Sequence, residues 1–229
     1  MIPIRDENPT EITPFVTVAL IAACILVFVW QVSHDPAGEA KISYSLGMIP
    51  AVLLKGADLD PSLVMVPPVV TVFTSMFLHG GLMHIIGNML YLWIFGNNVE
   101  DAMGHVRFIL FYLICGVVAA LTQALVQPAA TIPMIGASGA VSGVLGAYLL
   151  LHPHARVLVF IPFGFLSQMI HLPAVWVLGL WIGIQVLNSV MSGHAGGGVA
   201  WYAHIGGFVA GMALIPLFKY RRVRLFSPR

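Results

Sequence analysis

Charged side chains are missing from most of this chain, and the places where they are missing limit what it can fold into. Asp, Glu, Lys and Arg make up 8% of the 229 residues, against about 25% in ordinary soluble domains. Four stretches contain none of them: 12–34, 61–99, 108–155 and 157–218. Because a helix needs about 20 mostly apolar residues to cross a bilayer, these stretches have room for about six or seven spanning helices.

The same composition excludes several classes of protein. A net charge of +1, with no basic patch before the C-terminal tail, argues against a nucleic-acid partner. A soluble enzyme or a disordered chain would carry far more polar residues, and an outer-membrane barrel would alternate where these runs are solidly apolar. Cys24 and Cys115 stand alone within apolar runs, so we expect no disulfide, metal site or cofactor. We predict an all-α membrane protein.

Six helices follow from the apolar runs and the Pro and Gly residues between them. The polar segment Met1–Pro14 precedes an apolar run long enough to span, so we do not expect a cleavable signal. The first connection, 33–68, contains five prolines and six charges, and we expect it to be partly embedded at the membrane surface. A turn is expected at 97–107, and 157–172 is assigned to no element. The predicted helices are Phe15–Val32, Leu82–Gly96, Phe108–Gln127, Ser138–Leu151, Pro173–Met191 and Trp201–Phe218.

The distribution of Lys and Arg predicts the orientation. With six spans, Arg5, Arg107, Arg156 and the five cations of the tail fall on one side, and Lys41 and Lys55 on the other. Because cytoplasmic loops carry the excess of Lys and Arg, we expect both termini in the cytoplasm. The predicted organisation is a cytoplasmic segment 1–14, a membrane domain 15–218 and a basic cytoplasmic tail 219–229.

The fourth predicted helix is too short to cross a bilayer. Ser138–Leu151 has 14 residues, about 21 Å at the standard rise, against a hydrocarbon core of about 30 Å. With its end anchored at the cytoplasmic face, its first residue, Ser138, lies inside the membrane. Irregular backbone at that depth is tolerated only beside protein or a water-filled cavity, so we expect a functional site there.

Four of the polar side chains within the charge-free stretches are singled out as candidates for a functional site. They are His79, His84, Asn88 and His204, and intramembrane polar groups are candidates for function. His84 and Asn88 are four residues apart and so share a helix face. Taken singly, each is as well explained as an interfacial histidine, or as an amide that binds a neighbouring helix.

Ser138 and His204 are expected to meet through helix packing. Gly139 and Gly143 follow Ser138, and Gly207 and Gly211 follow His204; such small-residue pairs let two membrane helices approach closely.

The side chains present permit a Ser–His dyad. Histidine is the usual base for a serine nucleophile, and a helix N-terminus supplies free N–H groups for an oxyanion. Because no Asp or Glu lies near either residue in sequence, a Ser-His-Asp triad is not expected. The hydrolase motif G-x-S-x-G is not matched either, because position 140 is Ala.

Three motifs together resemble the rhomboid family of intramembrane serine proteases. They are Gly136-Ala137-Ser138-Gly139, His204-Ile-Gly-Gly-Phe-Val-Ala-Gly, and His79-x4-His84-x3-Asn88. The resemblance runs from about Thr71 to Leu214 and includes Gly96-x3-Glu100-x3-Gly104. It implies a six-helix bundle with a short fourth helix and a long first outer loop.

The resemblance also implies roles for individual residues. Ser138 would be the nucleophile and His204 the general base, while His84, Asn88 and the backbone N–H of Ser138 would hold the oxyanion. The substrate class implied is a transmembrane helix of another membrane protein, cut near its outer end by a protein of the bacterial inner membrane.

Further roles are implied around that dyad. His79 would organise the loop before the second helix, Gly136 would form the tight backbone before the serine, and Glu100 would be structural. Ser142 stands where many rhomboids have an aromatic residue against the histidine, and we hypothesise that its hydroxyl orients His204. Val70-Thr71 replace the Trp-Arg pair often found in the first outer loop.

Two other functions remain as alternatives. One is a rhomboid-like protein that binds membrane clients without cutting them, although both dyad residues are present. The other is a transporter, which the lack of charged side chains in the last three helices makes less attractive. The fifth helix and the Gly193–Gly198 loop are expected to move. The remaining histidines are predicted to be non-catalytic: His34, His105, His152, His154, His171 and His194.

Overall fold

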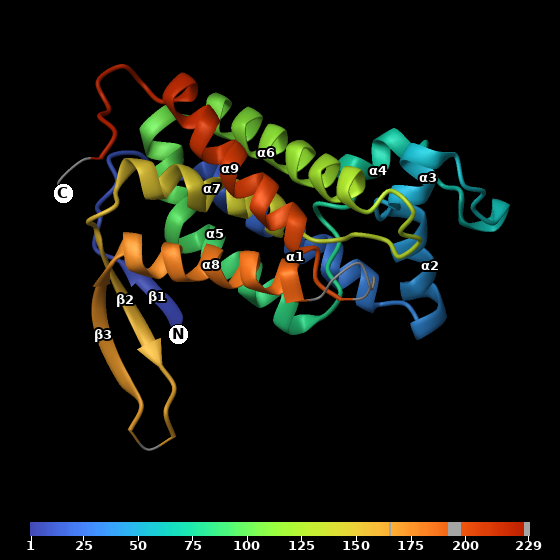
Figure 1. Cartoon of the computed structure of the whole chain (residues 1–229), viewed down its shortest axis with the longest axis horizontal. Coiled ribbons are helices and arrows are strands. Elements are labelled where there is room, and N and C mark those ends of the chain that lie inside the picture. The colour runs from blue at the N-terminus through green and yellow to red at the C-terminus, as the bar shows by residue number, and fades with distance from the viewer. Residues whose placement is uncertain (165, 192–197, 227–229) are drawn as a thin grey trace.

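The computed structural model describes residues 1–164, 166–191 and 198–226, and it is an elongated helical bundle (Figure 1). The sheet and the C-terminal segment lie at one end of the bundle, and the short helices α2–α4 lie at the other. The long helices are α1 (Phe15–Val32), α5 (Leu82–Met103), α6 (His105–Val126), α7 (Ser138–Leu151), α8 (Ala174–Met191) and α9 (Trp201–Phe218).

All six predicted helices are present, and three of them have the predicted bounds. The expected turn at 97–107 is wrong, because α5 continues to Met103 and α6 begins at His105. Gly104, with a φ of +80°, is the only residue between them. This positive φ suits glycine, which has no Cβ to clash, so the chain reverses over one residue instead of an eleven-residue turn.

The connection predicted at 33–68 contains short helices that begin at prolines, which occupy first helical positions readily. Asp35 caps α2 by accepting a hydrogen bond from the Gly38 N–H. Backbone bonds between Met48 and Met134 join this connection to the segment before α7. The elements are α2 (Pro36–Leu46), α3 (Pro50–Lys55), the 3-10 helix η1 (Pro61–Leu63) and α4 (Pro68–Thr74).

A small antiparallel sheet at one end of the bundle was not predicted. It consists of β1 (Ile2–Asp6), β2 (Arg156–Ile161) and β3 (Gln168–Pro173), in the order β1-β2-β3. Val157 and Val159 of β2 are fully buried against the helices. The β2–β3 hairpin occupies the segment that the sequence left unassigned, and it projects sideways from the bundle (Figure 1).

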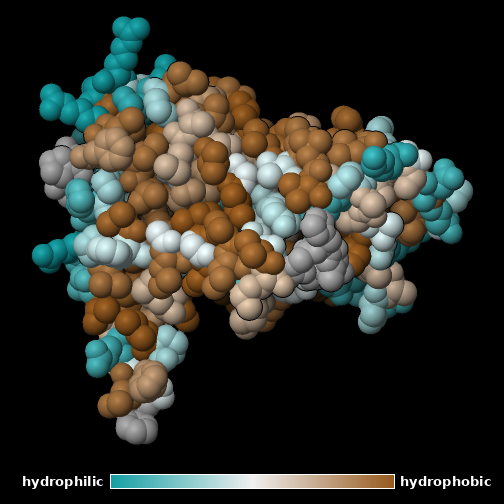
Figure 2. All heavy atoms as spheres, in the orientation of Figure 1, coloured by the Kyte–Doolittle hydropathy of each residue, from teal (hydrophilic) through white to brown (hydrophobic). Residues whose placement is uncertain are grey.

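The surface of the bundle suits a bilayer. Among the described residues, four helices are long and apolar enough to cross a membrane: α1, α6, α8 and α9. Helix α7 is apolar but short, and α5 is long but carries polar residues at both ends. Apolar side chains cover the middle of the visible face, and hydrophilic ones gather at its two ends (Figure 2).

Helices α7 and α9 pack backbone to backbone at their glycines. A Cβ at Gly207 would collide with the carbonyl oxygen of Gly139, and one at Gly211 with that of Gly143. Any larger residue would therefore push the helices apart. This close approach, predicted from the two glycine pairs, brings the start of α9 beside the start of α7. Most of the 193–198 loop, including His194, lies outside the described residues.

Candidate active site

Ser138 and His204 lie in contact where α7 and α9 begin. Ser138 is the first residue of α7, and His204 is one turn into α9. The Ser138 Oγ is 2.8 Å from the His204 Nε2. Only 9% of the surface of His204 is exposed. The geometry allows the imidazole to accept the proton of the hydroxyl.

The other nitrogen of His204 has a partner that the sequence analysis did not identify. The Oε1 of Gln185, on α8, is 2.8 Å from the His204 Nδ1. The side chain of Gln185 is buried. An amide inside a 62-residue charge-free stretch could have been singled out by the rule that identified Asn88, but its distance in sequence gives no indication of its partner.

His84 lies beside Ser138 with a defined tautomer. Its Nδ1 accepts a hydrogen bond from the Gly80 N–H at 3.2 Å, so the ring proton is on Nε2. The Nε2 lies close to Gly136, where an added Cβ would approach it within 2.7 Å. Gly136 also has a φ of +128°, so both its conformation and its space require glycine.

Unused hydrogen-bond donors converge on the same place. The Nδ2 of Asn88, one turn after His84, is buried and has no hydrogen-bond partner. The first N–H groups of a helix have no acceptor within it, and Ser138 begins α7. These donors, with the His84 Nε2, are the groups that an oxyanion at Ser138 would need.

His79 packs against His84 and is itself held by helix α1. It is completely buried, and its ring packs edge-on against His84 with the centroids 5.2 Å apart. The backbone N–H of His79 donates to the Oε1 of Gln31, on α1, at 3.0 Å. Helix α1 therefore fixes the loop that carries His79.

The hypothesis for Ser142 does not match the geometry. Its hydroxyl donates to the Ser138 carbonyl oxygen, one turn earlier in the same helix, at 2.6 Å. Both ring nitrogens of His204 already have partners, Ser138 and Gln185. A serine inside a helix often satisfies its hydroxyl in this local way, so it does not reach the neighbouring helix.

A cavity of about 1230 Å³ adjoins these residues. It extends from Tyr91 and Trp181 to the 128–135 segment and the start of α9. None of the five described histidines predicted to be non-catalytic lines it. Within the described ranges, no three His, Cys, Asp or Glu side chains lie together as potential metal ligands.

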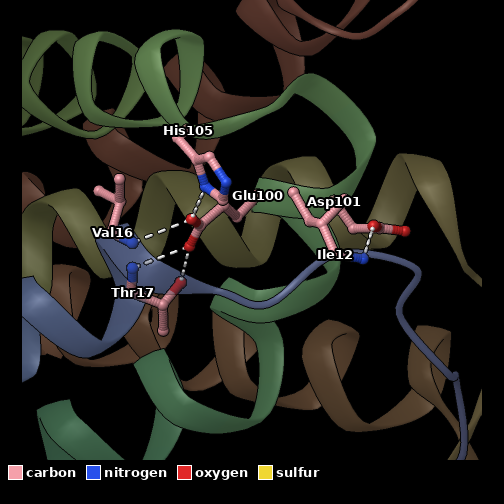
Figure 3. Close-up of polar contacts among 6 residues, drawn as sticks. All are labelled: Ile12, Val16, Thr17, Glu100, Asp101 and His105. Carbon is pink, nitrogen blue, oxygen red and sulfur yellow. Dashed lines mark hydrogen bonds and ion pairs between the residues drawn. The ribbon is translucent and has the colours of Figure 1, made fainter.

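Glu100 lies outside this cavity and ties two helices together (Figure 3). It is completely buried at the far end of α5. It accepts hydrogen bonds from the N–H groups of Val16 and Thr17, and from the hydroxyl of Thr17, at 2.7–2.9 Å. The His105 Nδ1 lies 2.6 Å from the Glu100 Oε1, the same oxygen that accepts from the Val16 N–H. The carboxylate thus caps α1, where an anion is favoured at the helix N-terminus.

Asp6 forms a second polar cluster at that end. It accepts hydrogen bonds from the Tyr148 hydroxyl at 2.7 Å and the Asn98 amide at 2.8 Å. Burial raises the pKa of the Asp6 carboxyl to about 6, although the hydrogen bond from Tyr148 opposes this shift. This cluster fastens β1 to α5 and α7.

The fold and the site together define a helical integral membrane protein with a Ser–His pair beside a cavity. The model of one family, the Rhomboid domain, matches residues 67–221. This match covers more than half of the chain, which therefore belongs to the rhomboid family.

Three curated proteins illustrate the similarity. Rhomboid protease GluP of Bacillus subtilis (strain 168) is 35% identical over 62% of this chain and 25% of its own length. RHOMBOID-like protein 1 of Arabidopsis thaliana is 30% identical over 87% and 47%. The mitochondrial Rhomboid protein 1 of Saccharomyces cerevisiae is 31% identical over 62% and 40%. This chain thus spans a quarter to about half of their lengths.

Proposed function

We propose that this protein is an intramembrane serine endopeptidase with Ser138 as nucleophile and His204 as general base. The contact of 2.8 Å between the Ser138 Oγ and the His204 Nε2 carries the proposal. Its position beside unpartnered donors and a large cavity supports catalysis over a structural role. The name of the Bacillus subtilis relative, a rhomboid protease, agrees with this reading.

The mechanism follows from the hydrogen bonds. His204 takes the proton of the Ser138 hydroxyl while the Oγ attacks the carbonyl carbon of the scissile bond. The developing oxyanion is held by the His84 Nε2–H, the Asn88 amide and the Ser138 N–H. The protonated His204 then gives its proton to the leaving amine, and a water molecule repeats the sequence to release the acyl group.

The substrate proposed is a transmembrane segment of another membrane protein. A peptide bond inside a helix is shielded, and its carbonyl is already hydrogen-bonded. The segment must therefore unwind before it reaches Ser138, and the cavity of about 1230 Å³ gives room for an extended stretch. Small or helix-breaking residues at the cut site would favour this step.

The orientation proposed has both termini in the cytoplasm of a bacterial cell, with the inner membrane around residues 15–218. The structure favours this because β1, the α5–α6 junction, the start of β2 and the 219–226 tail all lie at one end. That end carries most of the Lys and Arg residues. Segments 1–14 and 219–229 would then be cytoplasmic.

Cleavage of a transmembrane reporter tests the proposal. The purified protein in detergent is incubated with the reporter, beside Ser138→Ala and His204→Ala variants. Loss of cleavage in both, by about 10⁴-fold or more, is expected because neither residue can replace the other. A serine-reactive phosphonate should label the wild type but not Ser138→Ala.

Two matched variants control for general damage. Ser189→Ala removes a buried serine on α8 that does not line the cavity, and His154→Ala removes an exposed histidine. Both should cleave at the wild-type rate. Cleavage that survives in Ser138→Ala rejects this mechanism, and client binding without cleavage in the wild type indicates a non-proteolytic member.

A further inference from the structure

We propose that Gln185 is a positioning residue that holds His204 in the tautomer able to act as a base. The proposal deepens the proposed function and rests on it. A Ser–His pair works only when the nitrogen facing the serine is unprotonated, so something must keep the ring proton on the other nitrogen. Gln185 is the group within reach of that other nitrogen.

The hydrogen bonds of Gln185 determine which end of its amide faces His204. Its Nε2 donates to the backbone carbonyl oxygen of Trp181, one turn earlier in α8, at 3.1 Å. A carbonyl oxygen can only accept, so the NH₂ end must point there. The Oε1 is therefore the atom at 2.8 Å from the His204 Nδ1.

The tautomer of His204 follows from that orientation. Because the Gln185 Oε1 can only accept, the Nδ1 must carry the proton, and the Nε2 is left with a lone pair toward the Ser138 hydroxyl. A carboxylate does this work in serine protease triads, and a neutral amide does it beside the histidine of papain-like enzymes. An amide avoids placing a second charge inside the membrane.

Helix α8 fixes the ring in a second way. The Trp181 ring lies 5.8 Å from the His204 ring, tilted by 38°, and 6.3 Å from the ring of Tyr91 on α5. Thus α8 supplies both the hydrogen bond and an aromatic neighbour. Displacement of α8 away from α9 would therefore leave the contact between Ser138 and His204 but remove the acceptor that holds the His204 tautomer.

Replacement of Gln185 tests this role. Gln185→Leu keeps the bulk but removes the acceptor, and kcat should fall by about 10- to 100-fold with little change in KM. Gln185→Glu keeps an acceptor, so it should retain activity and move the pH–rate profile toward higher pH. Ser189→Ala, one turn further along the same helix, should change neither constant.

A measurement that needs no substrate separates this proposal from the proposed function. Nitrogen-15 NMR of the His204 ring should show a protonated Nδ1 in the wild type and a mixture of tautomers in Gln185→Leu. An unchanged tautomer, or an unchanged kcat in a Ser138-dependent reaction, overturns the role of Gln185. Cleavage that persists in Ser138→Ala overturns the dyad instead.

An independent observation concerns the β2–β3 hairpin, and we propose that it lies in the headgroup region of the adjacent leaflet. Residues 157–173 contain no Asp, Glu, Lys or Arg. Phe163, Leu166 and Met169 near its tip are exposed by 71%, 55% and 62%. The hairpin joins α7 to α8 and projects across the helix axes (Figure 1), so it runs along the membrane plane at the level of the helix ends.

The backbone of the hairpin limits its depth. In the described sheet β3 pairs on one side only, and an open strand edge does not enter the hydrocarbon core. At its base, the His171 Nε2 lies 3.0 Å from the Glu7 carboxylate. An apolar tip with an open edge and a polar base fits the boundary between headgroups and acyl chains.

A spin label tests this location. Phe163→Cys is labelled in a Cys24→Ala, Cys115→Ala background and reconstituted in liposomes, beside Arg222→Cys in the exposed tail. The label at 163 should be more accessible to oxygen and less accessible to a water-soluble nickel chelate than the label at 222. Equal accessibility at both sites, or dipolar broadening from a second copy paired at β3, overturns the proposal.

Discussion

Polar groups are buried near both ends of α5, and the two clusters differ in how completely they are hydrogen-bonded. At the start of the helix, the Asn88 Nδ2 has no partner, and His84, which lines the cavity with Ser138, has its Nε2 beside Gly136. At the other end, Glu100 accepts three hydrogen bonds from α1 and contacts His105. The cluster at Asn88 therefore has donors without acceptors, while the Glu100 carboxylate is fully hydrogen-bonded within the protein.

This difference separates a working site from a structural fastening. A buried polar group without a partner costs free energy, so a protein that keeps one gains something elsewhere, such as a bond to a transition state. A carboxylate whose oxygens are already hydrogen-bonded holds segments together, and it has no free acceptor with which to bind a substrate. Changes at the Glu100 end should therefore affect stability, and changes at the Asn88 end should affect catalysis.

The largest effect is expected from Glu100→Ala. It leaves the N–H groups at the start of α1 without acceptors, and removal of one member of such a buried network costs about 3–5 kcal/mol. The midpoint of unfolding in detergent should fall sharply, with an intermediate fall in Glu100→Gln. Cleavage per folded molecule should stay near the wild-type rate. A stable Glu100→Ala protein with little activity would reverse the assignment of this cluster.

A smaller effect, on activity instead of stability, is expected from Asn88→Ala. Removal of one oxyanion donor lowers kcat by about 10²–10³-fold, and the unfolding midpoint should not fall because the Nδ2 has no bond to lose. Asn98→Ala is the matched control on the same helix, because Asn98 donates to Asp6 and accepts from Asn8. That variant should lose stability and keep its kcat. Equal losses of stability in both variants would contradict the assignment of a catalytic role to Asn88 and a structural role to Asn98.

A third test concerns how stability depends on the ionisation of Asp6, which lies at the same end of the bundle as Glu100. Because burial raises the pKa of Asp6 from 3.8 to about 6, the folded protein holds this proton more tightly than the unfolded chain. Its contribution to stability is complete below about pH 4 and is lost as the pH rises through 6. The unfolding midpoint of the wild type should fall over this range relative to Asp6→Asn, whose amide oxygen can accept the same two bonds.

The control for this test is Asp58→Asn, at an exposed site in the first connection. Its pH profile should follow that of the wild type. If the profiles of wild type and Asp6→Asn coincide between pH 4 and 7, Asp6 does not titrate with the fold.

Local signals in the sequence predicted part of this architecture. Ser138–Leu151 has its predicted bounds because Gly136 stands before it and Pro153 after it, and its shortness indicated a site within the membrane. The extension of α5 to Met103 was missed because its polar last turns resemble a surface turn in sequence. Their partners, such as the N–H groups of Thr17 and Ile12, lie more than eighty residues away.

Two features of the site region depended on tertiary packing. The contact of Gln185 with His204 depends on how α8 is rotated about its axis, which the sequence of an apolar helix does not determine. The β2–β3 hairpin was missed because its apolar residues give no alternation that distinguishes a strand from a helix. The resemblance to a family supplied the roles of the dyad, but not the group that orients it.

The smallest effect is expected from Ser142→Ala, at a hydroxyl next to the dyad. The Ser142 hydroxyl donates to the Ser138 carbonyl oxygen, and the His204 Nδ1 is engaged by Gln185. Loss of a hydroxyl bound only within its own helix changes stability by about 1 kcal/mol or less, so kcat should stay within a few-fold of the wild type. Gln185→Leu should lower kcat more than Ser142→Ala does, and the double variant should match Gln185→Leu. The opposite ranking would mean that α7, rather than α8, orients the base.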